Sequence, residues 1–445
     1  MTGRQATEPS MHTGRSVSLR PCCDMLTKGD VVGRSETLRP VWAGENEGEE
    51  AIYGHYCQSA DNGTLPAEFF FPKKPFLATF TPKFLTLKAS ALSIAAPLHA
   101  KNIPFCLYRF PREETFRLAV PPEVLPHPKG QTFWMAPFCT QSKAKPVYLA
   151  VVQEAFIQEP FSAQVQTLPL QAELPDCPLP PATTKTEYLS RIHAFLKDIR
   201  SGLLDKAILS RVFYEEKPQD FDLFACFQRL ADAYPETFVH LSVHPESGIW
   251  IGATPELLLK KRGPSVAIMA LAGTQPRKQT AGYQWREKEM EEHLMVGRHI
   301  EATFAAYGCE LAERDGPNTI ERAKVAHLNT DYTFKTPERF PIQSFLSELH
   351  PTPAVGGLPV DKGVDCILAH EGYDRRYYCG FIGETDFETT ADLYINLRCM
   401  QIGKEKIAIY VGGGITAASD PEEEWQETVM KSKTMVDQIK EGEKS

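Results

Sequence analysis

The sequence predicts an α+β fold with a large antiparallel or mixed β-sheet at its core and helices flanking that sheet. Amphipathic helical segments and short strand-like runs follow one another without the strict strand–helix–strand alternation of a parallel fold. The chain has 445 residues, which is enough for a sizeable core. Its 42% hydrophobic and 24% charged residues are ordinary for a soluble globular protein.

Charge and cysteine content narrow the possible functions. The net charge of −9 gives no general attraction to nucleic acid or to an anionic membrane, so an anionic substrate would need a local basic pocket. The eleven cysteines are scattered without a C-x-x-C pair, which predicts reduced thiols in the cytoplasm and no zinc site. No stretch reaches ~18 uninterrupted apolar residues and no apolar signal core is present, so we expect neither a transmembrane helix nor a signal peptide.

The chain divides into three parts by composition. Residues 1–48 are polar and end near the acidic run GENEGEE, which predicts a poorly ordered leader. Residues 49–181 alternate short apolar runs with many prolines, a pattern typical of strands and turns rather than long helices, and close with a proline-rich linker. Residues 182–445 carry the remaining elements, and we expect them to form one structural domain together with 49–181.

The second half of the chain has the clearest periodicity. Apolar residues recur at helical spacing over 186–202, 218–235 and 285–307. A short helix is also expected at VDCILAHE, after a proline–glycine loop HPTPAVGGLP. The remaining runs resemble strands: DKAILSRVFYEE, residues 238–243 and 248–252, VAIMALAGTQPR, FPIQSF, YYCGFIG and DLYINLRCMQIG.

The C-terminal stretch IAIYVGGGITAASDPEEEWQETVMKSK combines a strand, a glycine run and a helix. Residues 407–411 alternate as a strand, and residues 412–414 are expected to turn the backbone and let a ligand approach closely. Asp420 and Pro421 form a helix start. A dinucleotide-binding fingerprint is rejected, because the helix starts too late and no second strand follows.

Two helices carry carboxylates that could hold a cation. On the last helix Glu424, Glu427 and Lys431 share one face, which suggests a cation and an anion bound side by side. In REKEMEEHLMV, Glu289 and Glu292 are three residues apart, and no H-E-x-x-H zinc motif is present. Oxygen ligands of this kind suit Mg²⁺. The alternative for both helices is an acidic, solvated surface.

These segments resemble the chorismate-utilising enzymes, which include anthranilate synthase component I, aminodeoxychorismate synthase, salicylate synthase and isochorismate synthase. The resemblance extends over residues 186–435 and is weak before them, apart from YRFP at 108–111. It rests on these motifs in one order: DKAILSR, GATPELLL, LAGTQPR, EKEMEEHLMV, LHPTPAVGGLP, YYCGFIG, LYINLRC and the C-terminal stretch. It implies the anthranilate synthase component I-like fold.

Within the family the pattern is most similar to isochorismate synthases. The form H-P-T-P-A-V differs from the anthranilate synthase version, and Ala272 stands where aminodeoxychorismate synthase has a nucleophilic lysine. Lys206 stands where the ammonia-using enzymes have another residue. The resemblance therefore implies Mg²⁺-dependent conversion of chorismate to isochorismate, with water added at ring C2 and the C4 hydroxyl lost. Isochorismate feeds menaquinone and catecholate siderophore biosynthesis.

The resemblance also implies residue roles. Lys206 is the base, which must lose its proton before it acts, and Glu256 is the acid, whose pKa burial would have to raise. The metal ligands are Glu292 and Glu427. Glu289 and Glu424 are expected to support these ligands or to bind the ion through water. The implied substrate-binding residues are Gly273, Thr274, His350, Ala354, Arg398, Gly413, Gly414 and Lys431. Arg398 is expected on a strand, where its guanidinium would pair with the enolpyruvyl carboxylate.

Three alternatives stay open. A salicylate synthase would go on to eliminate pyruvate from isochorismate, and it shares nearly all of these motifs. An aminating enzyme would need a glutaminase partner, which we do not expect here. A non-enzymatic acidic binding module would leave the ordered motifs without explanation. We further expect chorismate as the only partner, no nucleic acid or membrane contact, and a cytoplasmic monomer or weak homo-oligomer.

Overall fold

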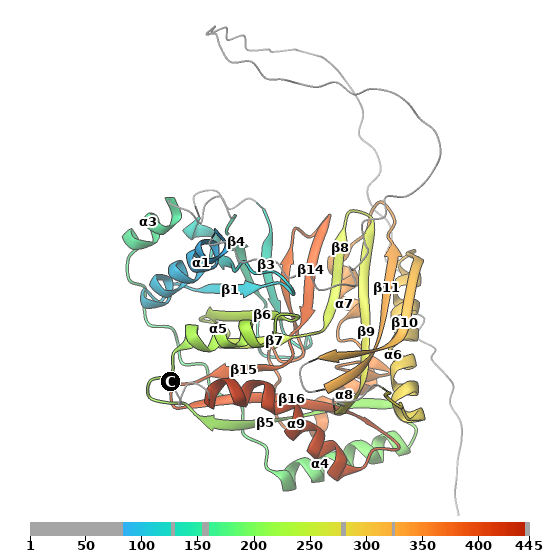
Figure 1. Ribbon diagram of the computed structural model, residues 1–445. Helices are drawn as coiled ribbons and strands as arrows, with labels where there is room; N and C mark the ends of the chain where they lie inside the picture. The colour runs from blue at the N-terminus through green and yellow to red at the C-terminus, as the bar shows by residue number, and fades with distance from the viewer. Residues whose placement is uncertain (1–82, 126–129, 154–159, 277–281, 323–324, 441–445) are drawn as a thin grey trace, which may run out of the picture. The chain divides into compact units, whose positions relative to one another are not determined.

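The computed structural model describes residues 83–125, 130–153, 160–276, 282–322 and 325–440. These residues form a 16-stranded sheet in the order β10-β11-β9-β8-β14-β13-β3-β4-β2-β1-β6-β7-β15-β16-β5-β12 (Figure 1). All strand pairs in this sheet are antiparallel. The predicted α+β class with a large antiparallel core is therefore confirmed.

The bounds of the elements are as follows. The strands are β1 (Phe105–Arg109), β2 (Arg117–Val120), β3 (Thr132–Ala136), β4 (Val147–Val151), β5 (Lys206–Glu216), β6 (Phe238–His244), β7 (Gly248–Thr254), β8 (Leu257–Arg262), β9 (Ser265–Pro276), β10 (Glu310–Arg322), β11 (Val325–Lys335), β12 (Gly357–Leu358), β13 (Phe381–Thr385), β14 (Thr390–Ile395), β15 (Cys399–Ile402) and β16 (Lys406–Thr416). The helices are α1 (Lys83–Ala100), η1 (Pro122–Val124), α3 (Pro160–Thr167), α4 (Lys185–Arg200), α5 (Leu223–Ala233), α6 (Glu287–Ala306), α7 (Ile342–Leu349), α8 (Val360–His370) and α9 (Pro421–Lys440).

Alternation along the strands divides the core into two buried clusters. Ala408 and Tyr410 of β16 belong to one cluster, and Ile407 and Ile409 belong to the other, because successive side chains of a strand point to opposite faces. The first cluster includes buried residues of α4, α6, α7 and α8. The second includes residues of α1, α5 and the C-terminal half of α9. The sheet thus presents an apolar surface to helices on both faces.

The predicted helices begin where their capping residues stand. The Thr184 hydroxyl accepts a hydrogen bond from the Glu187 N–H and forms a capping box that begins α4. Asp222 caps α5 in the same manner through its carboxylate. At α9 the Asp420 carboxylate accepts from the N–H groups of Glu422 and Glu423, as the sequence predicted. No helix in the described part of the chain is long and apolar enough to cross a membrane.

Several sequence-based expectations were wrong. The expected strand-and-turn region contains the 18-residue helix α1. The strand-like FPIQSF belongs instead to helix α7, which buries Ile342, Phe345, Leu346 and Leu349 at helical spacing. The glycines at 412–414 continue strand β16 rather than turning it. The expected leader over residues 1–48 lies outside the described residues.

Arg398 is the correction that matters most for the site. DLYINLRCMQIG forms two strands, β14 and β15, with Arg398 between them rather than on a strand. Its φ is +47°, in the left-handed region that side chains other than glycine rarely adopt. The backbone therefore changes direction at this arginine, and the two strands join different parts of the sheet, β14 beside β8 and β15 beside β7.

Candidate active site

A cavity of about 1090 Å³, its open mouth included, lies where β5, β9, β16, α6 and α9 meet. Its lining brings together residues that are more than two hundred positions apart in the chain, from Lys206 to Lys431. Ten of the twelve predicted site residues line it: Lys206, Glu256, Gly273, Glu292, Ala354, Arg398, Gly413, Gly414, Glu427 and Lys431. The sheet and two helices therefore gather the dispersed motifs around one space.

Lys206 is the first residue of β5 and is fully buried. Its Nζ lies 2.9 Å from Oε1 of Glu292 on α6. β5 pairs along its whole length with β16, which brings Gly414 opposite Ile208. A Cβ on Gly414 would lie 2.8 Å from Glu292 Oε1 and 3.0 Å from Lys206 Cε. Glycine is needed at this position because any side chain would enter the space that the ion pair occupies.

Glu256 lies in the short connection between β7 and β8 and is 6% exposed. Burial raises its pKa to about 7, against the opposing influence of the Lys206 and Lys431 charges. Burial acts this way because a low-dielectric environment disfavours the charged carboxylate. A carboxyl group with this pKa can carry a proton at neutral pH and release it to a bound molecule.

Lys431 and Glu427 form a second ion pair on α9. Lys431 Nζ lies 2.6 Å from Glu427 Oε1 and donates to the carbonyl oxygen of Gly412 at 2.9 Å. Glu424, Glu427 and Lys431 all line the cavity, so the face predicted from their spacing is correct. A Cβ on Gly413 would lie 3.4 Å from Glu427 Oε1, so this glycine leaves space beside the carboxylate.

Two further buried carboxylates are held by protein groups. Glu289 accepts from the N–H of Arg286 at 2.9 Å and from its Nε at 2.8 Å. Glu424 accepts from the Ser419 hydroxyl at 2.6 Å. Both are 4% exposed. These bonds fix the first turns of α6 and α9, which carry Glu292 and Glu427.

The residues present suit a hard divalent cation. Glu292 and Glu427 offer carboxylate oxygens to one cavity, and Gly413 and Gly414 keep the space beside these oxygens free of side chains. Mg²⁺ typically takes one or two protein carboxylates and completes its octahedral shell with water and substrate oxygens. Lys206 forms an ion pair with Glu292, and Lys431 forms one with Glu427.

Arg398 adds a further cation to the cavity wall. Its Nη1 donates to the Lys431 carbonyl oxygen at 3.4 Å and to the Thr434 hydroxyl at 3.3 Å. Burial lowers its pKa from the ordinary arginine value. Arg398, Pro255 and His327 also line a neighbouring cavity of about 730 Å³. The unusual backbone conformation thus places a guanidinium where the two cavities adjoin.

Two predicted residues are not placed in the cavity wall. His350 ends α7, and its ring packs edge-on against Phe381 with the ring centroids 5.2 Å apart. Burial lowers the pKa of His350 to about 4, so the ring is neutral at physiological pH. Thr274 lies on β9, but its side chain is outside the described part of the structure.

Sequence reasoning missed His327, Tyr378 and Tyr410, which also line the cavity. His327 lies on β11 and its Nδ1 is 3.2 Å from the carbonyl oxygen of Gly273, which fixes the backbone of a predicted substrate-binding residue. No signal pointed to it, because the hairpin β10–β11 was not anticipated. Tyr378 belongs to the motif YYCGFIG, which the sequence analysis used to identify the family without assigning a role to this tyrosine.

Comparison with known proteins agrees with this geometry. A family model described as chorismate binding enzyme matches residues 113–440. The chain belongs to the chorismate-binding enzyme family. It is 29% identical over 260 residues to the vibriobactin-specific isochorismate synthase of Vibrio cholerae. That match covers 56% of this chain and 66% of the relative, just under two thirds of its length.

Solved structures of this family share the fold. MenF, the menaquinone-specific isochorismate synthase from Escherichia coli, superposes with a TM-score of 0.61 at 19% identity, over 82% of this chain and 92% of MenF. Anthranilate synthase component I from Streptococcus pneumoniae superposes with a TM-score of 0.55 at 18% identity, over 70% of this chain and 81% of that protein. The anthranilate synthase component I-like fold expected from the motifs is confirmed.

Proposed function

We propose that this protein is an isochorismate synthase, which isomerises chorismate by adding water at ring C2 while the C4 hydroxyl leaves. The observation that carries the proposal is the placement of Lys206 and Glu256, a buried amine and a buried carboxyl with a pKa near 7, in the wall of one cavity. The name of the Vibrio cholerae relative supports the same activity. One water is consumed and one released, so the reaction needs no redox partner.

In this reaction Lys206 takes a proton from the attacking water, and Glu256 gives a proton to the departing hydroxyl. General acid–base catalysis needs a proton acceptor and a proton donor at two positions of the substrate. Glu256 suits the donor role because burial keeps its carboxyl protonated near neutral pH. Lys206 is placed for the acceptor role because its amine is buried at the cavity wall. Its ion pair with Glu292 favours the protonated amine, so this pair must open before Lys206 can take a proton from water.

Substrate binding rests on cations within an otherwise acidic protein. Chorismate carries two carboxylates, and the net charge of −9 would repel it from most of the surface. Arg398 and Lys431 supply positive charge inside the cavity. Arg398 offers a planar fork for the enolpyruvyl carboxylate. Gly273, Ala354, Gly413 and Gly414 let the ring approach the wall closely, and Thr274 and His350 stay predicted contacts.

We propose Mg²⁺ as the cofactor, held by Glu292 and Glu427. When bound, the ion neutralises the ring carboxylate and stabilises negative charge that develops on the conjugated ring. Glu289 binds Arg286 at the start of α6, and Glu424 binds Ser419 before α9. These contacts hold the first turns of the helices that carry Glu292 and Glu427. We also propose that the chain acts on chorismate without a glutaminase subunit and that it works in the cytoplasm. Residues 49–181 are proposed to belong to one domain with residues 182–445.

The test is incubation of the purified protein with chorismate and Mg²⁺, with products separated by chromatography. Isochorismate should appear, should need Mg²⁺, and should fall by about 10²–10⁴-fold in Lys206→Ala. Lys101→Ala is the control, because Lys101 lies far along the chain and binds main-chain carbonyls of the α3 region. Stoichiometric salicylate and pyruvate, or an aromatic amine formed only with glutamine and a partner, would contradict the proposal.

A further inference from the structure

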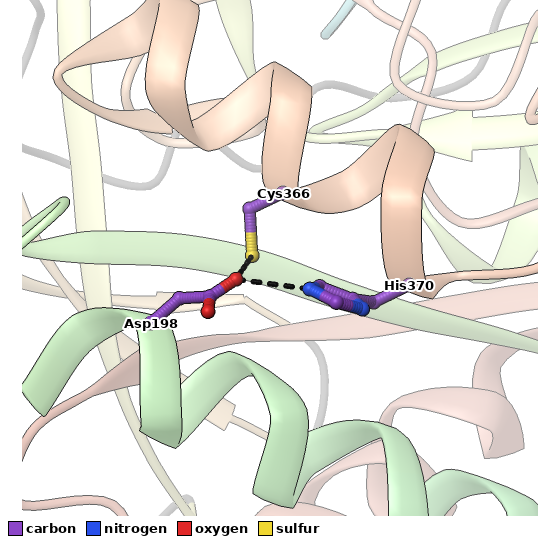
Figure 2. A group of neighbouring side chains, drawn as sticks. All are labelled: Asp198, Cys366 and His370. Carbon is purple, nitrogen blue, oxygen red and sulfur yellow. Dashed lines mark hydrogen bonds and ion pairs between the residues drawn. The ribbon is translucent and has the colours of Figure 1, made fainter. Parts of the chain in front are cut away.

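Outside the cavity, three side chains of different chemistry converge between α4 and α8. Asp198 comes from the last turns of α4, and Cys366 and His370 come from one face of α8 (Figure 2). His370 Nε2 lies 2.9 Å from Asp198 Oδ2, and Cys366 Sγ lies 3.7 Å from the same oxygen. The three atoms all lie within 4.8 Å of one another. None of these residues takes part in the proposed chemistry on chorismate.

The order of contacts excludes a nucleophilic triad. In such a triad the histidine stands between the cysteine and the acid and removes the thiol proton. Here the carboxylate oxygen of Asp198 stands between the thiol and the imidazole. Burial and the nearby Asp198 raise the pKa of the Cys366 thiol to about 12, the opposite of activation. The cluster is therefore unsuited to covalent catalysis by Cys366.

The same arrangement suits a metal ion of the zinc class. Thiolate, imidazole and carboxylate are the protein ligands that Zn²⁺ prefers. With Zn–S of about 2.3 Å and Zn–O of about 2.1 Å, a tetrahedral site places sulfur and oxygen about 3.6 Å apart. The observed S–O separation is 3.7 Å. The separation of His370 Nε2 from Asp198 Oδ2 is 2.9 Å, that of a hydrogen bond, and would widen by about 0.5 Å when both atoms bind the ion. The i and i+4 positions of Cys366 and His370 place both ligands on one side of α8.

We propose that Asp198, Cys366 and His370 form a site for Zn²⁺ or a similar divalent transition-metal ion, with a fourth position open to water. The ion can enter from solvent because the His370 and Asp198 side chains are 33% and 26% exposed. On binding, the thiol of Cys366 loses its proton to solvent and the thiolate sulfur joins the ion. The ion replaces the hydrogen bonds that Asp198 now accepts from Cys366 and His370.

The site has a structural consequence for the catalytic strand. α4 and α8 pack against each other and against β5, whose first residue is Lys206. α8 also follows directly on the loop that carries Ala354 and the edge strand β12. A metal ion that bridges Asp198 of α4 and two residues of α8 clamps the two helices together, and so restrains the start of β5.

The ion in this site differs from the ion proposed for the cavity. Glu292 and Glu427 offer only oxygen, which suits Mg²⁺, whereas the sulfur and nitrogen of Cys366 and His370 suit softer ions. The proposed site departs from the sequence analysis, which predicted no zinc site because the ligands come from two helices and form no C-x-x-C or H-E-x-x-H motif. The pair Cys-x-x-x-His inside an amphipathic helix was the available signal.

Addition of Co²⁺ to the chelator-treated, full-length protein tests the proposal. A thiolate bound to Co²⁺ gives a charge-transfer absorption band that oxygen ligands do not give, so the cavity carboxylates do not interfere. The band should appear in the unmodified protein, disappear on addition of Zn²⁺, and be absent in Cys366→Ser. His370→Ala should weaken Co²⁺ binding by about 100-fold or more, since even changes behind a ligand cost 10–100-fold.

Cys139→Ser is the matched control. Cys139 is a more exposed thiol that, like Cys366, lies near a carboxylate, that of Asp374. Its replacement should leave the band unchanged. Thermal unfolding gives a second measurement that does not depend on absorption: Zn²⁺ should raise the Tm of the unmodified protein and not that of His370→Ala. A missing band at saturating Co²⁺, or a band that survives Cys366→Ser and His370→Ala, would overturn the proposal.

Discussion

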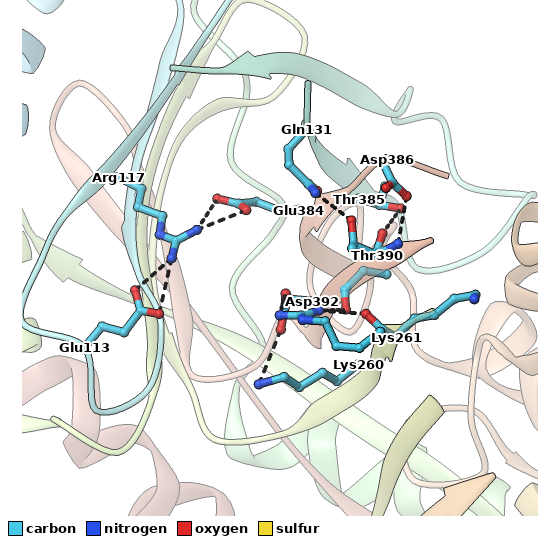
Figure 3. Close-up of polar contacts among 12 residues, drawn as sticks. Glu113, Arg117, Gln131, Lys260, Lys261, Glu384, Thr385, Asp386, Thr390 and Asp392 are labelled. Carbon is cyan, nitrogen blue, oxygen red and sulfur yellow. Dashed lines mark hydrogen bonds and ion pairs between the residues drawn. The ribbon is translucent and has the colours of Figure 1, made fainter. Parts of the chain in front are cut away.

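Glu256 and Glu384 are both nearly buried glutamates, and burial raises the pKa of each carboxyl above its ordinary value. Their surroundings differ. Glu384 on β13 accepts hydrogen bonds from the Tyr108 hydroxyl and from Arg117, which lies 3.3 Å away and also binds Glu113 (Figure 3). Glu256 instead lines the cavity, and its carboxyl is influenced by the more distant charges of Lys206 and Lys431.

The difference teaches that a raised pKa alone does not identify a catalytic acid. The lone pairs of Glu384 are directed at fixed protein donors, so its carboxyl group has a structural role. The carboxyl of Glu256 faces a space that a substrate can enter, so its proton can be transferred. Access to the cavity, together with the pKa, separates the two roles.

The largest expected effect is the loss of activity in Glu256→Gln. The amide keeps the shape of the side chain but cannot donate an acidic proton, so turnover of chorismate should fall by about 10²–10⁴-fold. Chromatographic measurement of isochorismate formation checks this, with urea unfolding to confirm that the fold is intact. Activity within a few-fold of the unmodified protein would show that Glu256 is not the acid.

Glu384→Gln should change the stability of the protein and leave its activity unchanged. Loss of the charge weakens the buried hydrogen bond from Tyr108, and hydrogen bonds to charged groups contribute about 1.5–3 kcal/mol. The free energy of unfolding in urea should fall by roughly that amount, while isochorismate formation per folded molecule stays unchanged. If this variant lost activity as completely as Glu256→Gln, the distinction between the two glutamates would fail.

The pH dependence of turnover sharpens the comparison further. Glu256 must be protonated to act as an acid, and its pKa is raised to about 7. The protonated fraction of Glu256 should therefore fall as pH rises through 7, by about tenfold per pH unit above it, while deprotonation of Lys206 acts in the opposite direction. Turnover should show an ionisation near pH 7. Glu384→Gln should leave the profile in place, because Glu384 is held away from the substrate. A pH profile without an ionisation near pH 7 would contradict the assignment of Glu256.

The smallest expected effect comes from filling the space beside a cavity carboxylate. In Gly414→Ala the added Cβ would lie 2.8 Å from Glu292 Oε1, the end of a side chain that can shift. Such crowding costs about 1–3 kcal/mol. We therefore expect the Mg²⁺ concentration that gives half-maximal activity to rise by roughly 5–100-fold. Gly413→Ala, whose nearest contact is 3.3 Å, is the milder control. Equal effects of the two changes would argue against a tight fit at Gly414.

Helical periodicity and capping predicted the helices that cover the sheet. α4, α5, α6 and α9 were found because each buries one apolar stripe and leaves the other face polar. α7 carries the same stripe over eight residues and was taken for a strand, because so short a segment allows either interpretation. α1 was missed because its mostly apolar sequence, with Pro97 inside it, obscures the helical period.

The sequence predicted which residues form the site, but it did not predict how their side chains contact one another. The family motifs named Lys206, Glu256 and the two metal ligands, and the structure lines one cavity with them. Sequence could not show that Lys206 contacts Glu292, nor that Lys431 contacts Glu427. It also could not show that Arg398 interrupts a strand, because the left-handed conformation there is imposed by the different partners of β14 and β15.

The pairing of β5 with β16 has a consequence during synthesis of the chain. β5 is made early, but its partner β16 follows about 200 residues later, which takes about 10–40 s at ordinary translation rates. Until then Lys206 lacks β16 and Gly414, which lies beside its side chain, although the short strand β12 on its other side is made earlier. The nascent protein therefore exposes a largely unpaired catalytic strand for many seconds, and chaperone binding to this segment should matter for the yield of active enzyme.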